Sequence, residues 1–210
     1  MIEKGLRAPD FHLQDQNHQR IELSAFQGTK VCMLFLSSIT RLDNQAFIIS
    51  YAKMIDAFSA LNVRIIAVCE DSEDILKAES KRLHIPFSLL HDPNQAVRRK
   101  YGVWNQKMTF GKPKWITARS SLLIDENGFI YKTFKRAHVE MNVLEVLKLL
   151  KRDNERNEWR KLSRRKKERI KREQEQCYHR MVEDSGFFKN DELIDFIEAF
   201  QYTENEKMEG

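Results

Sequence analysis

Apolar residues in the first 150 positions follow two spacings, and each spacing predicts a different kind of element. Residues 30–36 and 63–69 are nearly continuous apolar runs, which are typical of strands buried on both faces of a sheet. Between these runs, Asp43 or Asn44 is expected to cap a helix whose apolar positions recur every three or four residues: Phe47, Ile48, Tyr51, Ile55 and Phe58. A second helix is predicted over 73–83.

Shorter elements follow up to residue 150. We expect a third strand over 86–90 and a short helix over 92–102 that opens at Asp92-Pro93. A hairpin over 120–134 and a closing helix over 140–150 follow. The hairpin signal is strong because Asn127-Gly128 separates two apolar runs, and this dipeptide favours the positive φ angles of tight hairpin turns. Strands alternating with helices predict an α/β layered fold.

The apolar content falls sharply after residue 150, which predicts a boundary between a domain over 1–150 and a charged helical tail over 151–210. Residues 151–176 contain neither Gly nor Pro and hold twelve Lys/Arg against six Asp/Glu, so we expect a basic helix over 151–185. Residues 177–210 hold three Lys/Arg against nine Asp/Glu, and an acidic amphipathic helix is predicted over 190–201. The two blocks cancel within a net charge of +5.

Composition excludes several classes of protein. No apolar run approaches the ~18–20 residues that cross a bilayer, and the first residues lack the apolar stretch of a secretory signal. Three scattered cysteines do not form a disulfide framework, so we expect a reducing, cytoplasmic setting. The six histidines show no ligand spacing and the seven glycines no phosphate-binding pattern, so neither a metal nor another cofactor is predicted.

Several motifs in the first 150 residues occur in the order and spacing of one known family: Gly5–Leu13, Leu23–Gly28, Leu89–Asp92, Tyr101–Trp104, Gly111-Lys112 and Arg119–Gly128. They resemble the alkyl hydroperoxide reductase/thiol-specific antioxidant family, the peroxiredoxins, and within it the bacterioferritin-comigratory branch. The resemblance covers roughly residues 2–150. It implies a thioredoxin-like fold, in which a mixed central sheet has helices on both faces, and a thiol-dependent peroxidase activity.

The resemblance also implies a nucleophilic cysteine in a Thr-x-x-Cys loop after the first central strand, where a helix amino terminus and an Arg stabilise the thiolate. Thr40 matches the family Thr, and Arg119 lies where the family has its activating Arg. The cysteine position corresponds to Asp43, or to Leu42 if the loop is one residue short. The branch's second, resolving cysteine corresponds to about Phe47. Neither position carries sulfur.

Two interpretations of Asp43 follow. In the first, its carboxylate replaces the charge of the thiolate and forms a hydrogen-bonded ion pair with Arg119, while Thr40 binds the remaining carboxylate oxygen. In the second, Asp43 only caps its helix and Arg119 faces solvent. These three residues are the vestigial site that we predict.

The three cysteines have different expected roles. Cys32 lies within a predicted central strand and is expected to be a buried, small apolar side chain. Cys69 ends the next strand, at the edge of the sheet where α/β proteins bind ligands, so it is the candidate for a displaced catalytic thiol. Cys177 is expected to be an exposed thiol in the tail.

The basic run at 160–172 is a candidate partner-binding surface, centred on Arg164, Arg165, Lys166, Lys167 and Arg169. Such a run can bind RNA, a ribosome or an anionic surface by releasing counterions from phosphates. The alternatives are a solvated helix, a coiled-coil arm, or a basic helix that the acidic helix folds back upon and masks.

Three functions are therefore open. The first is a peroxiredoxin-like protein without peroxidase activity that acts as a binding or regulatory module through its tail. The second is an active antioxidant oxidoreductase that uses a displaced thiol such as Cys69. The third is an RNA- or ribosome-associated adaptor that works through the basic helix. The family resemblance makes a homodimer plausible in all three.

Overall fold

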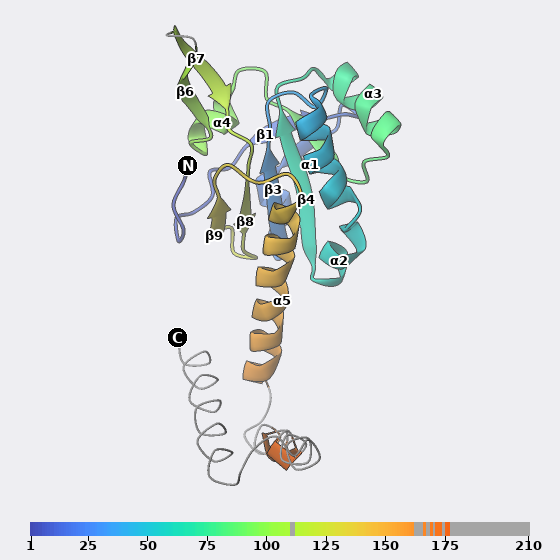
Figure 1. The fold of residues 1–210 in the computed structure, drawn as a ribbon, viewed down its shortest axis with the longest axis vertical. Helices are drawn as coiled ribbons and strands as arrows, with labels where there is room; N and C mark the ends of the chain where they lie inside the picture. The colour runs from blue at the N-terminus through green and yellow to red at the C-terminus, as the bar shows by residue number, and fades with distance from the viewer. Residues whose placement is uncertain (110–111, 162–165, 167–168, 170, 174, 177–210) are drawn as a thin grey trace, which may run out of the picture. The chain divides into compact units, whose positions relative to one another are not determined.

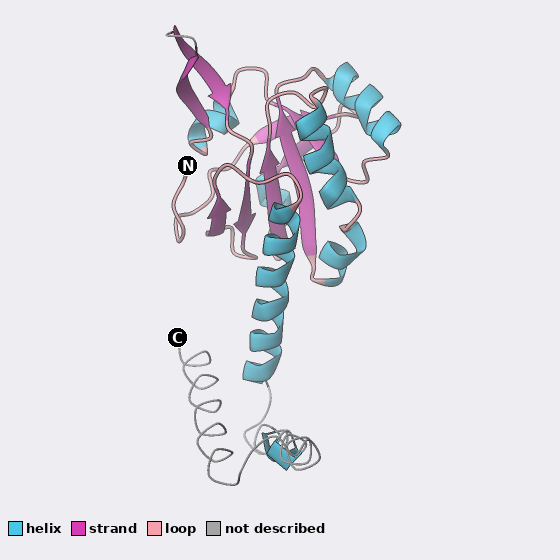
Figure 2. Ribbon diagram, in the orientation of Figure 1, coloured by secondary structure: helices cyan, strands magenta, loops and turns pink. Residues whose placement is uncertain are grey.

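The computed structural model describes residues 1–109 and 112–161, together with 166, 169, 171–173, 175 and 176. The chain divides into two compact units, Met1–Leu150 and Lys151–Gly210. Figure 1 traces the chain, and Figure 2 distinguishes its helices from its strands. The strands and the candidate site around Asp43 belong to the first unit.

A seven-stranded mixed sheet forms the centre of the first unit, in the order β2-β1-β5-β4-β3-β8-β9. The three central strands β3, β4 and β5 are parallel, and β8 joins β3 in antiparallel orientation. The central strands consist mainly of Val, Ile, Leu and other apolar residues, because both faces of this part of the sheet are covered. The strands are β1 His12–Asp15, β2 Arg20–Glu22, β3 Lys30–Phe35, β4 Val63–Cys69, β5 Ser88–His91, β8 Ser120–Ile124 and β9 Ile130–Phe134.

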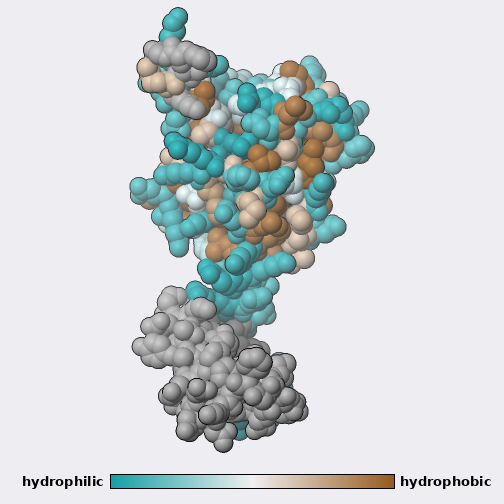
Figure 3. Space-filling view, viewed as in Figure 1, coloured by the Kyte–Doolittle hydropathy of each residue, from teal (hydrophilic) through white to brown (hydrophobic). Residues whose placement is uncertain are grey.

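Helices lie on both faces of the sheet and enclose two apolar cores (Figure 2). One face packs against α1 (Leu42–Ala52), α2 (Ile55–Ala60), α3 (Glu73–Leu83) and the first turns of α5 (Met141–Lys161). The other face is covered by the N-terminal segment, the 3₁₀ turn η1 (Leu23–Phe26) and α4 (Ala96–Lys100). Apolar residues that reach the surface form small groups separated by polar ones on the face drawn in Figure 3.

Two further strands form a hairpin of their own, outside the main sheet. β6 (Trp104–Thr109) and β7 (Lys112–Thr117) pair only with each other among the described strands. In Figure 1 this hairpin stands away from the sheet at the upper left.

The mixed sheet with helices on both faces confirms the expected α/β architecture, and several boundaries differ. The predicted helix after residue 43 breaks at Lys53-Met54 into α1 and α2. The elements expected over 140–150 and from 151 onward are one continuous helix, α5, as far as Lys161. β1, β2, β6 and β7 were not predicted. The acidic helix over 190–201 lies outside the described residues.

No helix among the described residues has the length and apolarity needed to cross a membrane.

Candidate functional site

The loop 36–41 lies at the carboxyl end of β3, where parallel α/β sheets form their ligand crevices. Asp71, just after β4, holds this loop in place. Its two carboxylate oxygens accept hydrogen bonds from the Ser38 hydroxyl at 2.6 Å and from the Ile39 amide at 2.7 Å. From α1, the Asn44 side chain donates to the Ser38 carbonyl at 2.8 Å. Hydrogen bonds from Asp71 on one side and Asn44 on the other therefore fix the conformation of the loop.

Asp43 and Arg119 form the ion pair of the first of the two interpretations. Arg119 Nη1 lies 3.1 Å from Asp43 Oδ2, and this contact brings together the first turn of α1 and the segment before β8. The other carboxylate oxygen, Oδ1, accepts a hydrogen bond from Arg41 Nε at 3.2 Å. Asp43 thus lies between two guanidinium groups, in the first turn of α1 where the helix dipole also favours a negative charge.

Thr40 does not take the expected position. Its hydroxyl lies 2.7 Å from the Ser38 hydroxyl, and Arg41 rather than Thr40 bonds the second oxygen of Asp43. The reason is that the Ser38 hydroxyl donates a hydrogen bond to Asp71, which leaves its oxygen to accept a hydrogen bond from the Thr40 hydroxyl. That part of the prediction is wrong.

Asp43 and Asn44 do not cap the helix either. The N-cap residue of α1 is Arg41, which has extended backbone angles and makes no side-chain capping bond. Asp43 lies inside the first turn, and the side chain of Asn44 points back to the loop.

Arg119 is held by more than the carboxylate. Its Nε donates to the Ala137 carbonyl at 3.0 Å, and its guanidinium carbon lies 5.7 Å from the centre of the Phe47 ring. The side chain of Arg119 is 24% exposed and that of Asp43 is 47% exposed. The ion pair is therefore accessible to water, which makes its net contribution to stability small.

The Asp43 carboxyl is ionised at neutral pH. Desolvation acts to raise the pKa of this carboxyl, but the hydrogen bonds and charges of Arg41 and Arg119 outweigh it and lower the pKa below its ordinary value. The group that occupies this site is thus a fixed anion.

The two cysteines that the structure describes are both fully buried. Cys32 lies within β3, as expected of a core residue. Cys69 ends β4, and burial raises the pKa of its thiol; the charges of Asp71 and Glu70 act in the same direction, and the charge of Arg98 offsets them only in part. A buried thiol with a raised pKa remains protonated at pH 7, and the protonated form is a poor nucleophile. Cys177 lies outside the described residues.

A buried ionic network near Cys69 was not predicted from the sequence. Arg98 on α4 is completely buried; its Nε donates to Asp92 at 3.0 Å, and its Nη1 lies 2.6 Å from Glu70. The Thr117 hydroxyl joins the network, donating to Glu70 at 2.5 Å. In the sequence, the only sign of this network is that Asp92 is followed six residues later by the oppositely charged Arg98, and that spacing does not indicate that the two side chains are buried.

Of the candidate residues in the tail, Lys166 and Arg169 are described, and both are exposed. Arg169 lies 3.6 Å from Glu173, one helical turn further on. Arg164, Arg165 and Lys167 lie outside the described residues, so their role remains a prediction.

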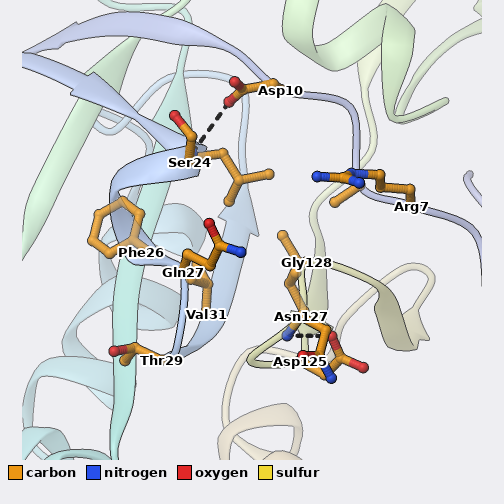
Figure 4. Close-up of a pocket in the computed structure, with 13 residues that line it drawn as sticks. Arg7, Asp10, Ser24, Phe26, Gln27, Thr29, Val31, Asp125, Asn127 and Gly128 are labelled. Carbon is orange, nitrogen blue, oxygen red and sulfur yellow. Dashed lines mark hydrogen bonds between the residues drawn. The ribbon is translucent and has the colours of Figure 1, made fainter.

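A shallow pocket lies at the opposite end of β3 from Asp43 (Figure 4). It is formed by the N-terminal segment, η1 and the β8–β9 turn. Its carboxylates serve the local backbone: Asp10 accepts from the Ser24 amide at 3.3 Å, and Asp125 from the Asn127 amide at 3.0 Å. Among the described residues, no group of three His, Cys, Asp or Glu side chains is placed to hold a metal ion.

Comparisons with known proteins bear on the family and the fold of the first unit. Residues 5–133 match the model of the AhpC/TSA family. The chain is 28% identical over 150 residues to the peroxiredoxin Bcp of Bacillus subtilis, covering 71% of this chain and 96% of that protein. It is 27% identical over 150 residues to the peroxiredoxin Bcp of Escherichia coli, covering 70% of this chain and 96% of that one.

Solved structures show the same fold. The bacterioferritin comigratory protein of Xanthomonas campestris, solved in a study of its alkyl peroxide reduction activity, superimposes with a TM-score of 0.69 at 21% identity. The match covers 72% of this chain and 99% of that one. The thioredoxin-like peroxiredoxin fold of the first unit is thereby confirmed.

Proposed function

Because the chain belongs to the AhpC/TSA family, we propose that it is a family member without peroxidase activity that acts as a binding or regulatory module. The observation that carries this proposal is the fixed anion in the first turn of α1, Asp43. No cysteine occurs between positions 33 and 68, and the arginine of the site is paired with the Asp43 carboxylate.

The chemistry of peroxide reduction explains why this substitution matters. A thiolate sulfur attacks one peroxide oxygen, the O–O bond breaks, and the second oxygen leaves with a proton as water or an alcohol. The sulfur is oxidised to a sulfenic acid, which a second thiol reduces again. A carboxylate has no sulfur to oxidise, so Asp43 supplies the charge of the thiolate without its reactivity.

The active-oxidoreductase alternative requires Cys69 to attack the peroxide. Against this stand its full burial, its raised pKa and the two acidic residues beside it, Glu70 and Asp71. A reactive cysteine needs access for the substrate and a cation that is free to stabilise the thiolate, whereas Arg98, the cation near Cys69, is already paired with Asp92 and Glu70.

A binding role requires a partner surface, and we place one on the basic tail. Lys166 and Arg169 are exposed and carry positive charge, which suits an acidic protein or RNA partner. The homodimer, the cytoplasmic location and the adaptor role at RNA or ribosomes also remain proposals.

The test is the rate at which the purified full chain consumes hydrogen peroxide in the presence of dithiothreitol. We expect a rate no higher than that of buffer, and the same result for the matched variants Cys69→Ala and Asp43→Ala. Sustained turnover by the wild type that disappears in Cys69→Ala would overturn the proposal in favour of a displaced thiol.

A further inference from the structure

Helix α4 and the β6–β7 hairpin carry charge of one sign. Between Asp92 and Asp125 the sequence contains seven Lys or Arg residues and no Asp or Glu. Two of the seven are used internally, since Arg98 belongs to the buried network and Arg119 pairs with Asp43. The other five lie on α4 and the hairpin: Arg99, Lys100, Lys107, Lys112 and Lys114.

Three flat groups are stacked at the base of this hairpin. The Arg99 guanidinium lies over the Trp104 ring, 4.2 Å from its centre. On Trp104 lies Trp115, with ring centres 4.4 Å apart and planes 13° from parallel. Trp115 is 52% exposed. The stack thus starts at a cation and ends on an indole that is open to solvent.

The buried network holds this stack in position. Arg98 fixes α4, which places its neighbour Arg99 over the first ring. Thr117 fixes the end of β7 through its bond to Glu70, and the Ala118 amide donates to the Val103 carbonyl at 2.9 Å where the two strands begin to pair. The stacking surface is therefore formed before any ligand arrives, which lowers the entropy cost of binding.

The strand register gives the hairpin two different faces. Trp104, Met108 and Trp115 lie on one face, while Lys112 and Lys114 lie on the other. Because the ribbon has only two strands about 5 Å apart, long lysine side chains reach its edges. A strand lying on the Trp face would meet the stacked rings below it, Arg99 at the α4 end, and Lys112 and Lys114 reaching round the β7 edge.

We propose that this face of the hairpin is a binding site for single-stranded nucleic acid. A base stacks on the open side of Trp115, while Arg99 and the two β7 lysines neutralise the neighbouring phosphates, which is how sequence-tolerant single-strand binding works. A docked protein is less well matched, because the described hairpin exposes only two large apolar side chains, Met108 and Trp115.

The site supplies a ligand class for the binding module, and in that respect it rests on the proposed function. The two fail separately, because the hairpin variants leave Asp43 and Arg119 intact and the peroxide assay does not depend on Trp115.

The test is a titration of fluorescein-labelled oligo(dT) of about 15 nucleotides with the full chain, followed by anisotropy at about 50 and 200 mM salt. We expect saturable binding that Trp115→Ala weakens about tenfold and Trp115→Phe largely retains. The double variant Lys112→Gln/Lys114→Gln should reduce the slope of log K against log salt by about 1.4.

Two controls separate the hairpin from other surfaces. Phe129→Ala removes another exposed aromatic, 40% accessible, and should leave the affinity unchanged. Lys166→Gln/Arg169→Gln tests the tail. Absence of binding at about 50 mM salt, equal affinity for a duplex of the same length, or a loss confined to the tail variant would each overturn the proposal.

Discussion

Replacing Arg119 by Ala removes three interactions, and we expect it to destabilise the first unit by about 2 kcal/mol. Most of this comes from the charged hydrogen bond to the Ala137 carbonyl, since such bonds contribute about 1.5–3 kcal/mol and this one is partly exposed. The contact with the Phe47 ring adds about 0.5 kcal/mol. The ion pair adds least, because Asp43 is 47% exposed and exposed pairs contribute about 0.2–1 kcal/mol.

A double-mutant cycle measured by urea denaturation at pH 7 separates these contributions. Asp43→Ala alone should cost about 0.5 kcal/mol, and the coupling energy with Arg119→Ala should stay below about 1 kcal/mol. Arg119→Lys serves as the control, because it keeps the charge and loses the planar guanidinium that bonds Ala137 and Asp43 together. A coupling energy above about 2 kcal/mol would show that the pair is desolvated, and equal losses for the two single variants would refute the assignment to Ala137.

Three further predictions concern the same region. Because Arg41 and Arg119 lower the pKa of Asp43, its contribution to stability is present above the unfolded pKa of about 3.9 and is lost as the pH falls through the lower, folded value. In urea titrations the destabilisation by Asp43→Asn should therefore be constant from about pH 5 to 8, begin to shrink near about pH 4 and disappear only below the folded pKa. Asp43→Cys places a thiol in the first turn of α1 between two guanidinium groups, so the pKa of this thiol should fall below about 8.5. The new thiol should therefore react with Ellman's reagent at pH 7 faster than either Cys32 or Cys69, and a rate equal to theirs would contradict the described geometry. Arg98→Met leaves the buried Asp92 carboxylate without a countercharge and should lower the free energy of unfolding by about 3 kcal/mol or more. The control Thr117→Val should lower it by about 1 kcal/mol. Similar losses of stability for the two variants would argue against the network.

The elements that were predicted from the sequence are those whose pattern reflects burial. β3 and β4 are continuous apolar runs because helices cover both faces, and the β8–β9 turn contains Asn127-Gly128, in which Gly128 has a φ angle of 84° that favours glycine. The β6–β7 hairpin was missed because it is not covered: its strands hold lysines, Pro113 and isolated tryptophans, a pattern that also fits a loop.

For the site, sequence reasoning identified the residues but not all of their contacts. The pairing of Asp43 with Arg119 followed from a position that needs an anion beside a cation. The wrong assignment of Thr40 has a long-range cause, since Asp71, more than thirty positions away, determines where Ser38 points. The Arg98 network likewise joins α4 to the ends of three different strands, and no local pattern encodes that meeting.

The proposed absence of a working sulfur nucleophile is tested most directly by trapping the sulfenic acid that such a nucleophile would form. The native full chain is exposed to one equivalent of hydrogen peroxide in the presence of dimedone, which reacts with sulfenic acids, and its intact mass is then measured. We predict no adduct on the native chain. A rapid, stoichiometric adduct on one native cysteine would show that a working thiol is present and would contradict the account.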